Sequence, residues 1–378
     1  MHLSNITQSI KPSLTRHLFN LAKAYDDVID FTPHQAIKDA GCRAIQEGRT
    51  RYSQNAGLLE LREVISQYCK KKEHIDYNPL DEIIVTVGAM EGLYLSLLSL
   101  LNPGDEVIIP APYYVNYEQM VQMCHAKPIV VDNPEKLGFK VEDVEKAITD
   151  KTKVIIINTP SNPSGKIIPA EKIEALATLA KQYDLVIISD EVYKCLIYGD
   201  SKFKSIVNIE GMRERTILVN SLSKEFCMTG WRIGYVLAPS EVIAAMTKLQ
   251  ENVAACAPLP SQYAAIEALS GKDDYSANMV NIFTKRRNIL VKGINNISKL
   301  SCETPEATFY LMVDISGTGM KSEEFAIALL KTVHVAVVPG ITYGRSCDNY
   351  VRMAFTLKED KIQEGMKRIQ TFINQFFL

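Results

Sequence analysis

The feature that most constrains this chain is a series of short apolar runs between about residues 80 and 240. Each run is rich in valine and isoleucine, and stretches with helical periodicity separate most of them. Strands that are apolar throughout are buried on both faces, which is typical of a mainly parallel sheet covered by helices. The expected strands are 82–87, 106–110, 128–131, 153–158, 185–190, 216–220 and 233–238. The expected helices are 57–72, 89–101, 115–124, 170–183 and 240–252.

After about residue 280 the pattern changes. A long charged helix is expected at 278–298, with strands near 308–314 and 333–338 and helices near 322–331 and 359–376. The sequence therefore predicts an α/β fold: a large domain with a mainly parallel seven-stranded sheet between helices, plus a smaller α+β domain. The large domain is expected at 33–280. The small one is expected at 281–378 together with 1–32, because so short an N-terminal segment cannot fold alone.

Composition narrows the class of protein. The 378 residues are 47% hydrophobic and 23% charged, with a net charge of −2, which is typical of a globular protein that binds neither nucleic acid nor an anionic membrane. The eight cysteines form no CxxC pair and the six histidines no HExxH, so we expect no metal site. Scattered cysteines, no secretory signal and no long apolar run indicate a cytoplasmic protein with free thiols and no membrane span.

Residues that could bind a ligand follow two of the expected strands. In open α/β sheets, ligands bind beyond the carboxyl ends of the strands. Gly88-Ala89-Met90 follows strand 82–87 and begins a helix, whose free N–H groups could hold a phosphate; a plain strand–helix turn explains this segment equally well. After strand 153–158, the proline-rich segment 159–165 would hold Asn162 rigidly, although such segments are more often simple loops.

Two charged residues stand at other strand ends. Asp190 ends strand 185–190, where a buried acid is costly unless it meets a cation; a helix N-cap is the simpler interpretation of that segment alone. Lys224 follows strand 216–220, between small residues and an apolar strand that contains glycine, which is not typical of a surface lysine. A desolvated lysine amine has a lowered pKa and can condense with an aldehyde.

Together these segments resemble the class I/II aminotransferases, which are pyridoxal 5′-phosphate (PLP) enzymes of fold type I. The family pattern covers essentially the whole chain, in order and at family spacing. SNPSG alone is a weak signal. SLSK followed by an arginine after seven residues, with SDEVY upstream and an arginine near the C-terminus, is specific. The matching segments are RYSQNAGLLELRE, VTVGAMEGL, LNPGDEVIIPAPYYVNY, SNPSG, SDEVY, SLSKEFCMTGWRIGY and YVRMAF.

The resemblance implies roles around the cofactor ring. Lys224 is expected to carry PLP as a Schiff base and, once free, to move the Cα proton of the substrate. Asp190 is expected to pair with the pyridinium nitrogen and so keep the ring an electron sink. Tyr193 and Asn162 are expected to donate hydrogen bonds to the 3′-oxygen, and the ring of Tyr114 to stack on the pyridine.

The resemblance also implies groups for the phosphate and the substrate. Arg232 pairs well with phosphate because its guanidinium is bidentate, and Arg352 is expected to bind the substrate α-carboxylate beside Asn162 for the same reason. Tyr52 is expected to reach the phosphate from the other subunit of a homodimer with shared active sites. The remaining expected phosphate ligands are the amides of Ala89 and Met90 and the hydroxyl of Ser221.

The reaction is inferred from the resemblance. One lysine, aspartate and arginine set serves transamination, C–S β-elimination, decarboxylation and α-oxidation. We expect transfer of the amino group of an L-amino acid to a 2-oxo acid, with a PLP-dependent C–S β-lyase or another PLP enzyme of this fold as the alternative. A PLP-sensing transcription regulator would need an N-terminal DNA-binding module, for which the first residues show no pattern. The complete set of cofactor residues disfavours an inactive homologue.

The residue at position 90 indicates which amino-acid side chains the site prefers. Some relatives that use dicarboxylates have a lysine there, whereas Met90 offers a soft apolar contact. We therefore expect neutral or apolar amino acids to be favoured over aspartate. Arg16 and Arg345 are the cations that could instead supply a second carboxylate contact.

One segment departs from the family pattern. Between residues 28–30 and the helix after Pro33, the chain lacks a glycine-containing loop that lies beside the substrate in relatives. A genuine deletion would open the site. We instead expect that the protein has this loop and that the printed residues skip it. Active-site lids have low local stability, so such a loop would be mobile. Bonded Cα atoms lie about 3.8 Å apart, so the spacings at Phe31–Thr32 and Thr32–Pro33 distinguish the two explanations.

Overall fold

A seven-stranded sheet forms the centre of the larger part of the molecule. The computed structural model describes residues 3–10, 32–133, 137–271 and 275–377. The strand order is β1-β7-β6-β5-β4-β2-β3, and only β7 runs antiparallel to its neighbours. The predicted fold class is therefore confirmed. The strands are β1 (Ile83–Thr86), β2 (Glu106–Pro110), β3 (Lys127–Val131), β4 (Thr152–Asn158), β5 (Val186–Asp190), β6 (Thr216–Ser221) and β7 (Gly234–Leu237).

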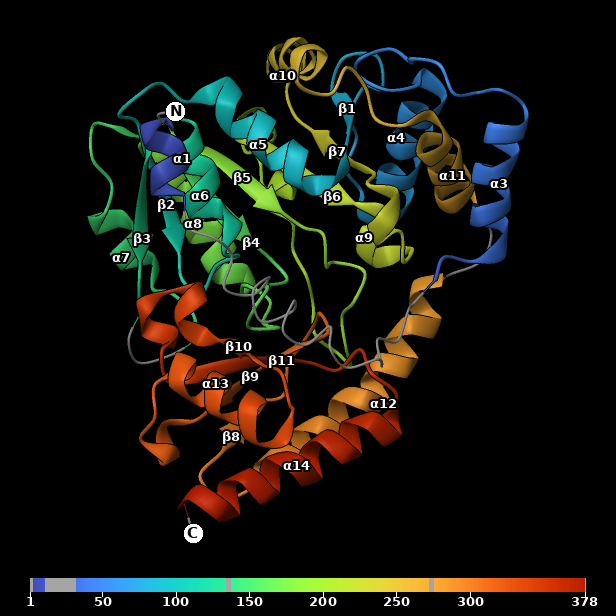
Figure 1. The fold of residues 1–378 in the computed structure, drawn as a ribbon. Helices are drawn as coiled ribbons and strands as arrows, with labels where there is room; N and C mark the ends of the chain where they lie inside the picture. The colour runs from blue at the N-terminus through green and yellow to red at the C-terminus, as the bar shows by residue number, and fades with distance from the viewer. Residues whose placement is uncertain (1–2, 11–31, 134–136, 272–274, 378) are drawn as a thin grey trace.

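Helices cover both faces of this sheet (Figure 1). Alternate residues of a strand point to opposite faces. Accordingly, Ile109 packs in a core with residues of α5, α6 and α10, whereas Ile108 packs in a core with residues of α8. A third core joins β1 and β7 to α4 and to α11 (Leu259–Ser270). The predicted helices are observed as α4 (Leu59–Glu73), α5 (Gly88–Leu100), α6 (Asn116–Met123), α8 (Ala170–Gln182) and α10 (Ser240–Val253).

Several short or flanking helices were not predicted, whereas α3 is the helix expected after Pro33. α11 packs against both α3 and α4, so these three form a cluster beside β1. α9 lies at the end of β6, where it carries Lys224. These elements are α1 (Asn5–Ser9), α3 (Gln35–Gln46), α7 (Val141–Lys146), α9 (Leu222–Glu225) and α11 (Leu259–Ser270).

The smaller part contains a four-stranded sheet of order β10-β11-β9-β8, drawn in the lower half of Figure 1. The strand expected at 333–338 is largely wrong, because α13 continues to Val333 and the left-handed residue His334 (φ 58°) ends it. Only the last expected residue joins β10. The domain boundaries stay a prediction. The elements are α12 (Tyr275–Asn295), β8 (Ser301–Cys302), β9 (Tyr310–Asp314), α13 (Ser322–Val333), β10 (Val338–Pro339), β11 (Tyr350–Ala354) and α14 (Glu359–Phe377).

The expected loop omission before Pro33 is wrong. The full sequence of 378 residues is numbered without a gap, so the segment is short in the chain itself. Phe31, and with it the spacing to Thr32, lies outside the described residues, as do residues 28–30. Among the described helices, none is long and apolar enough to cross a membrane.

Candidate active site

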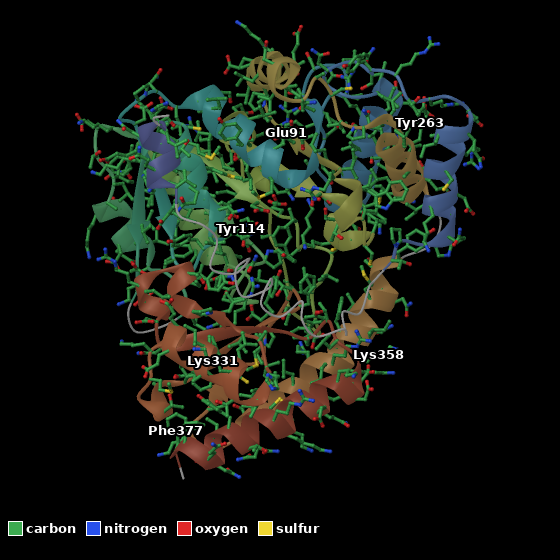
Figure 2. The ribbon with its side chains drawn as sticks, in the orientation of Figure 1. Glu91, Tyr114, Tyr263, Lys331, Lys358 and Phe377 are labelled. Atoms are coloured by element: carbon green, nitrogen blue, oxygen red, sulfur yellow. The ribbon has the colours of Figure 1, made fainter. Side chains whose placement is uncertain are left out.

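A cavity of about 970 Å³ lies where the carboxyl ends of β4, β5 and β6 face the small sheet. Figure 2 shows Tyr114 between the two parts of the molecule. Tyr52 does not line this cavity; its side chain is 85% exposed. The cavity brings together ten of the eleven residues singled out from the sequence: Ala89, Met90, Tyr114, Asn162, Asp190, Tyr193, Ser221, Lys224, Arg232 and Arg352.

Asp190 is a buried carboxylate that faces this cavity. It ends β5 and is 4% exposed. Tyr117 donates its hydroxyl to Oδ2 at 2.6 Å, and the Val192 amide donates to Oδ1 at 3.4 Å. Burial raises the pKa of Asp190 to about 6, and these two hydrogen bonds oppose the rise. Because both donors are neutral, the carboxylate is suited to meet a cation in the cavity.

Lys224 approaches the same cavity from α9, directly after β6. Its Nζ lies 5.7 Å from the ring centre of Tyr193 and 5.4 Å from that of Phe309. The turn that presents it is fixed by Ser221, whose Oγ accepts from the Ser223 amide at 3.1 Å and lies 3.1 Å from the Ile233 carbonyl, to which it donates. The amine is thus held among aromatic rings at the end of a buried strand.

Arg232 and the start of α5 form a corner suited to an anion. Gly88 has φ +72°, and a Cβ placed on it would lie 2.6 Å from Nη2 of Arg232. A Cβ on Gly234 would lie 2.8 Å from the Ala89 nitrogen. Both glycines therefore allow the guanidinium and the strand to approach the first turn of the helix. Free N–H groups beside a guanidinium make a phosphate site.

Arg352 lies on β11 and is 8% exposed. Its Nη1 donates to Oδ1 of Asn162 at 2.8 Å, and its guanidinium lies 4.2 Å from the ring centre of Tyr310. Its Nε is buried without a hydrogen-bond partner. A buried guanidinium with an unused donor is suited to bind a carboxylate.

Tyr117 and Tyr310 were missed in the sequence. The hydroxyls of Tyr310 and Tyr193 lie 3.2 Å apart. Burial raises the pKa of Tyr310, but Arg352 and Lys224 outweigh it and hold that pKa below its usual value. The segment PYYVNY contains Tyr117 and could have drawn attention to it; nothing near Tyr310 gave a comparable signal.

Met90 sits in a neutral part of the cavity. The Tyr114 hydroxyl lies 3.6 Å from its sulfur and the Asn116 amide 3.5 Å. The Tyr114 ring makes an edge contact with Tyr117, with centres 5.6 Å apart. Arg345 is exposed and does not line the cavity, and Arg16 lies outside the described residues.

These groups match the chemical parts of PLP. Its phosphate suits the Arg232 corner, its ring nitrogen suits the Asp190 carboxylate, and its aldehyde suits a lysine amine such as that of Lys224. The fold and the site thus define a PLP-dependent enzyme with the cofactor at the carboxyl ends of a mainly parallel sheet.

Comparison with known proteins specifies the family. The aminotransferase class I and II family matches residues 23–369. The chain is 38% identical to an aspartate aminotransferase from Pyrococcus abyssi and 36% identical to aromatic-amino-acid aminotransferase 2 from Thermococcus litoralis, each over 99% of both chains. The crystal structure of the aspartate aminotransferase from Rhizobium meliloti superposes with a TM-score of 0.93 at 31% identity, over 99% of both chains.

The chain therefore belongs to the aminotransferase class I and II family. It is a PLP-dependent aminotransferase, which transfers the amino group of an L-amino acid to a 2-oxo acid. These relatives support transamination over the alternative of a C–S β-lyase.

Proposed function

We propose that Lys224, Asp190 and Arg232 hold PLP and that Arg352 binds the α-carboxylate of the amino acid. When bound, PLP supplies an electron sink for negative charge at the substrate Cα. Lys224 Nζ would be the amine that holds the cofactor and would serve as the base for the substrate Cα proton. Asp190 would be the carboxylate that pairs with a protonated ring nitrogen. The observation that carries the proposal is the buried Asp190 carboxylate, with neutral donors only, lining the same cavity as Lys224.

The other cavity residues complete this assignment. Tyr193 and Asn162 would hold the cofactor through its 3′-oxygen. Oδ1 of Asn162 already accepts from Arg352 at 2.8 Å, so Asn162 would use its amide N–H group. Tyr114 would stack on the cofactor ring. The Ser221 hydroxyl, which donates to the Ile233 carbonyl, would turn to donate to the phosphate instead. The amides of Ala89 and Met90 supply the remaining phosphate contacts.

Arg352→Ala tests the carboxylate assignment. Hydrogen bonds to charged groups contribute about 1.5–3 kcal/mol, so KM for the amino donor should rise about 10- to 100-fold while the cofactor absorbance persists. Arg345→Ala, which removes an exposed arginine outside the cavity, is the matched control. An unchanged KM in Arg352→Ala would remove Arg352 from this role.

The preferred amino donor has a neutral or apolar side chain. Met90 supports this, because its neighbours Tyr114 and Asn116 carry no positive charge for a second carboxylate. A panel of amino acids, followed by the spectral change of the cofactor half-reaction, measures the preference. Leucine, methionine or an aromatic donor should react faster than aspartate. Aspartate as the fastest donor would contradict the assignment.

The enzyme acts as a cytoplasmic homodimer with shared active sites. The exposed ring of Tyr52 supports the shared site, since one chain alone leaves it outside the cavity. The eight free cysteines support a reducing compartment. Tyr52→Ala should weaken PLP binding, whereas Tyr183→Ala on the exposed end of α8 should not. An active monomer in sedimentation at assay concentration would refute the dimer.

A further inference from the structure

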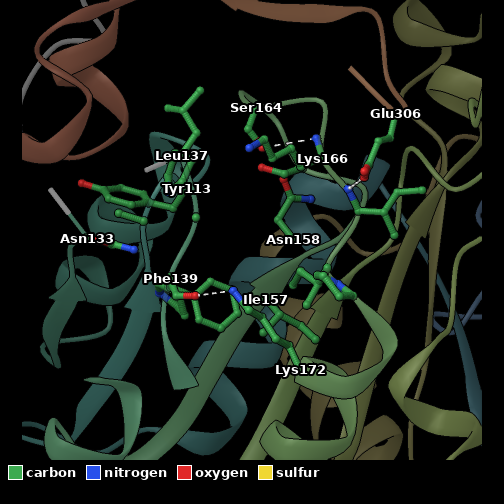
Figure 3. Close-up of a pocket in the computed structure, with 18 of the residues that line it drawn as sticks. Tyr113, Asn133, Leu137, Phe139, Ile157, Asn158, Ser164, Lys166, Lys172 and Glu306 are labelled. Atoms are coloured by element: carbon green, nitrogen blue, oxygen red, sulfur yellow. Dashed lines mark hydrogen bonds between the residues drawn. The ribbon is translucent and has the colours of Figure 1, made fainter. Parts of the chain in front are cut away.

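A second cavity lies beside the active site. Its volume is about 570 Å³, within the range of small-molecule sites, and it opens between residues 137–140 and the loop after β4. Figure 3 shows Tyr113 and Leu137 facing Ser164 and Lys166 across this opening. No role assigned above uses this space.

The walls of the second cavity are largely apolar. Aromatic rings come from Tyr113, Tyr117 and Phe139, and all three residues are less than 9% exposed. Ile156 and Ile157 of β4 also contribute to the lining. A surface of this kind suits an aromatic ring or a branched aliphatic chain, because binding removes apolar area from water.

Two polar groups of this cavity have hydrogen-bonding capacity left over for a ligand. Ser161 is 7% exposed and its hydroxyl has no hydrogen-bond partner in the structure. Lys172 donates to the Phe139 carbonyl at 2.6 Å and lies 5.3 Å from the centre of that ring, and no described carboxylate lies within ion-pair distance of it. An ammonium group has three donors, so two of them stay free for an anion.

Of the other charged residues that line this cavity, Lys140 is exposed to solvent, and Lys166 and Glu306 already have partners. Lys166 pairs with Glu303 at 2.6 Å. Glu306 accepts the Ile167 amide at 2.9 Å, a contact drawn in Figure 3. Lys172 is therefore the cation of this lining that is best placed to receive a carboxylate.

We propose that this second cavity binds a small carboxylic acid with an aromatic or branched apolar body, whose carboxylate pairs with Lys172. The unsatisfied Ser161 hydroxyl supplies a further hydrogen bond. The ion pair with Lys172 binds the carboxylate. The aromatic walls add affinity, because they bury the apolar body of the acid away from water.

The second cavity shares residues with the active site. Tyr117 lines the second cavity and donates to the Asp190 carboxylate at 2.6 Å. Asn158 lines both cavities; its Nδ2 donates to the Asp190 carbonyl at 3.1 Å and its Oδ1 accepts the Asn162 amide at 2.7 Å. An acid bound here therefore contacts side chains that position Asp190 and Asn162, so it acts as an effector.

Calorimetric titration of the PLP-loaded Arg352→Ala enzyme with 3-phenylpropionate tests the site. The Arg352→Ala background suppresses carboxylate binding in the active site, and the probe has no amino or oxo group to react. One equivalent should bind per chain, and 3-phenylpropylamine, with the opposite charge, should not bind. Binding of two equivalents would mean that the active site still binds the acid without Arg352. That result would contradict the role proposed for Arg352 but would leave the second site intact. Absence of binding overturns the second site.

Added variants locate the bound acid. Lys172→Met should weaken binding at least tenfold, whereas Lys181→Met, on the same helix and bonded to the Glu210 carbonyl, should leave it unchanged. Gly138→Phe should block the cavity, since a Cβ there meets no atom within 4 Å and the residue lines the space. Gly365→Phe on α14, equally open, is its control. Undiminished binding in either Lys172→Met or Gly138→Phe overturns the proposal.

The effector role has a separate readout. In the Arg352→Ala enzyme, bound 3-phenylpropionate should shift the pH midpoint of the cofactor absorbance, and Lys172→Met should abolish that shift. Binding that leaves the midpoint unchanged would overturn the link to Asp190.

Discussion

Asp190 and Glu191 are consecutive buried carboxylates with opposite surroundings. Asp190 is 4% exposed, faces the active-site cavity and receives hydrogen bonds from neutral donors only. Glu191 is 0% exposed and points into the protein, where Lys194 pairs with it at 3.2 Å and Ser189 donates to it at 3.0 Å. Burial raises the pKa of both carboxyl groups.

The difference separates a structural acid from a functional one. Lys194 also pairs with Glu73 at 2.6 Å, and although burial lowers the pKa of Lys194, the two glutamates raise it above its usual value. Glu191 is thus neutralised within the protein. Asp190 has no such partner among the described residues, so its charge is compensated only when a cation enters the cavity.

The largest expected effect is on turnover in Asp190→Ala. A buried pyridinium without its carboxylate costs about 3–5 kcal/mol, which corresponds to a loss of about 10²- to 10⁴-fold in kcat/KM. The apoenzyme should remain folded in urea titration, because the variant removes an uncompensated charge. Near-normal kcat/KM would take Asp190 out of its assigned role.

Glu191→Ala should lower stability and largely spare turnover, the opposite of Asp190→Ala. Removing one partner of a buried ion pair destabilises a protein by about 3–5 kcal/mol, and Ser189 and Ser205 also lose their acceptor. The free energy of unfolding should fall accordingly, while the kcat of the folded fraction stays within about tenfold of normal. Glu191→Gln, which keeps hydrogen bonding, should lose less. A stable but inactive Glu191→Ala enzyme would erase the distinction between the two acids.

The pH dependence of apoenzyme stability gives a smaller effect. The pKa of Asp190 rises from 3.8 to about 6 on folding, so between these values the folded state binds more protons than the unfolded state. Stability should therefore fall by about 2–3 kcal/mol as pH rises from 4 to 6. Asp190→Asn should remove this part of the slope, as should PLP in the holoenzyme. An equal slope in wild-type and Asp190→Asn apoenzyme would contradict the raised pKa.

Much of the large sheet could be predicted because each strand is a buried apolar run with a clear end. The residues after those ends meet in one cavity for the same reason, since parallel strands present their carboxyl ends at one edge. The family pattern then distinguished Lys224 and Arg352 from other lysines and arginines. Local sequence indicated that Lys224 is an unusual lysine, but it gave no role for Arg352.

Features that depend on distant contacts could not be predicted. Tyr117 reaches Asp190 from α6, 73 residues earlier in sequence, and Glu73 meets Lys194 across 121 residues. The expected strand at 333–338 failed because Val333 still belongs to α13, residues 334–337 lie in no helix or strand, and only Val338 joins β10. Tyr52 could not be placed in a site by one chain, since its expected partner is a second subunit.

The most direct test of the account is to locate the lysine that holds PLP. The PLP-loaded enzyme would be reduced with sodium borohydride, digested and analysed by mass spectrometry, with Lys224→Ala treated in parallel. The account predicts a phosphopyridoxyl group on Lys224 as the stoichiometric modification, and no stoichiometric label or turnover in the folded Lys224→Ala protein. A stoichiometric label on another lysine, or an active Lys224→Ala enzyme, would contradict it.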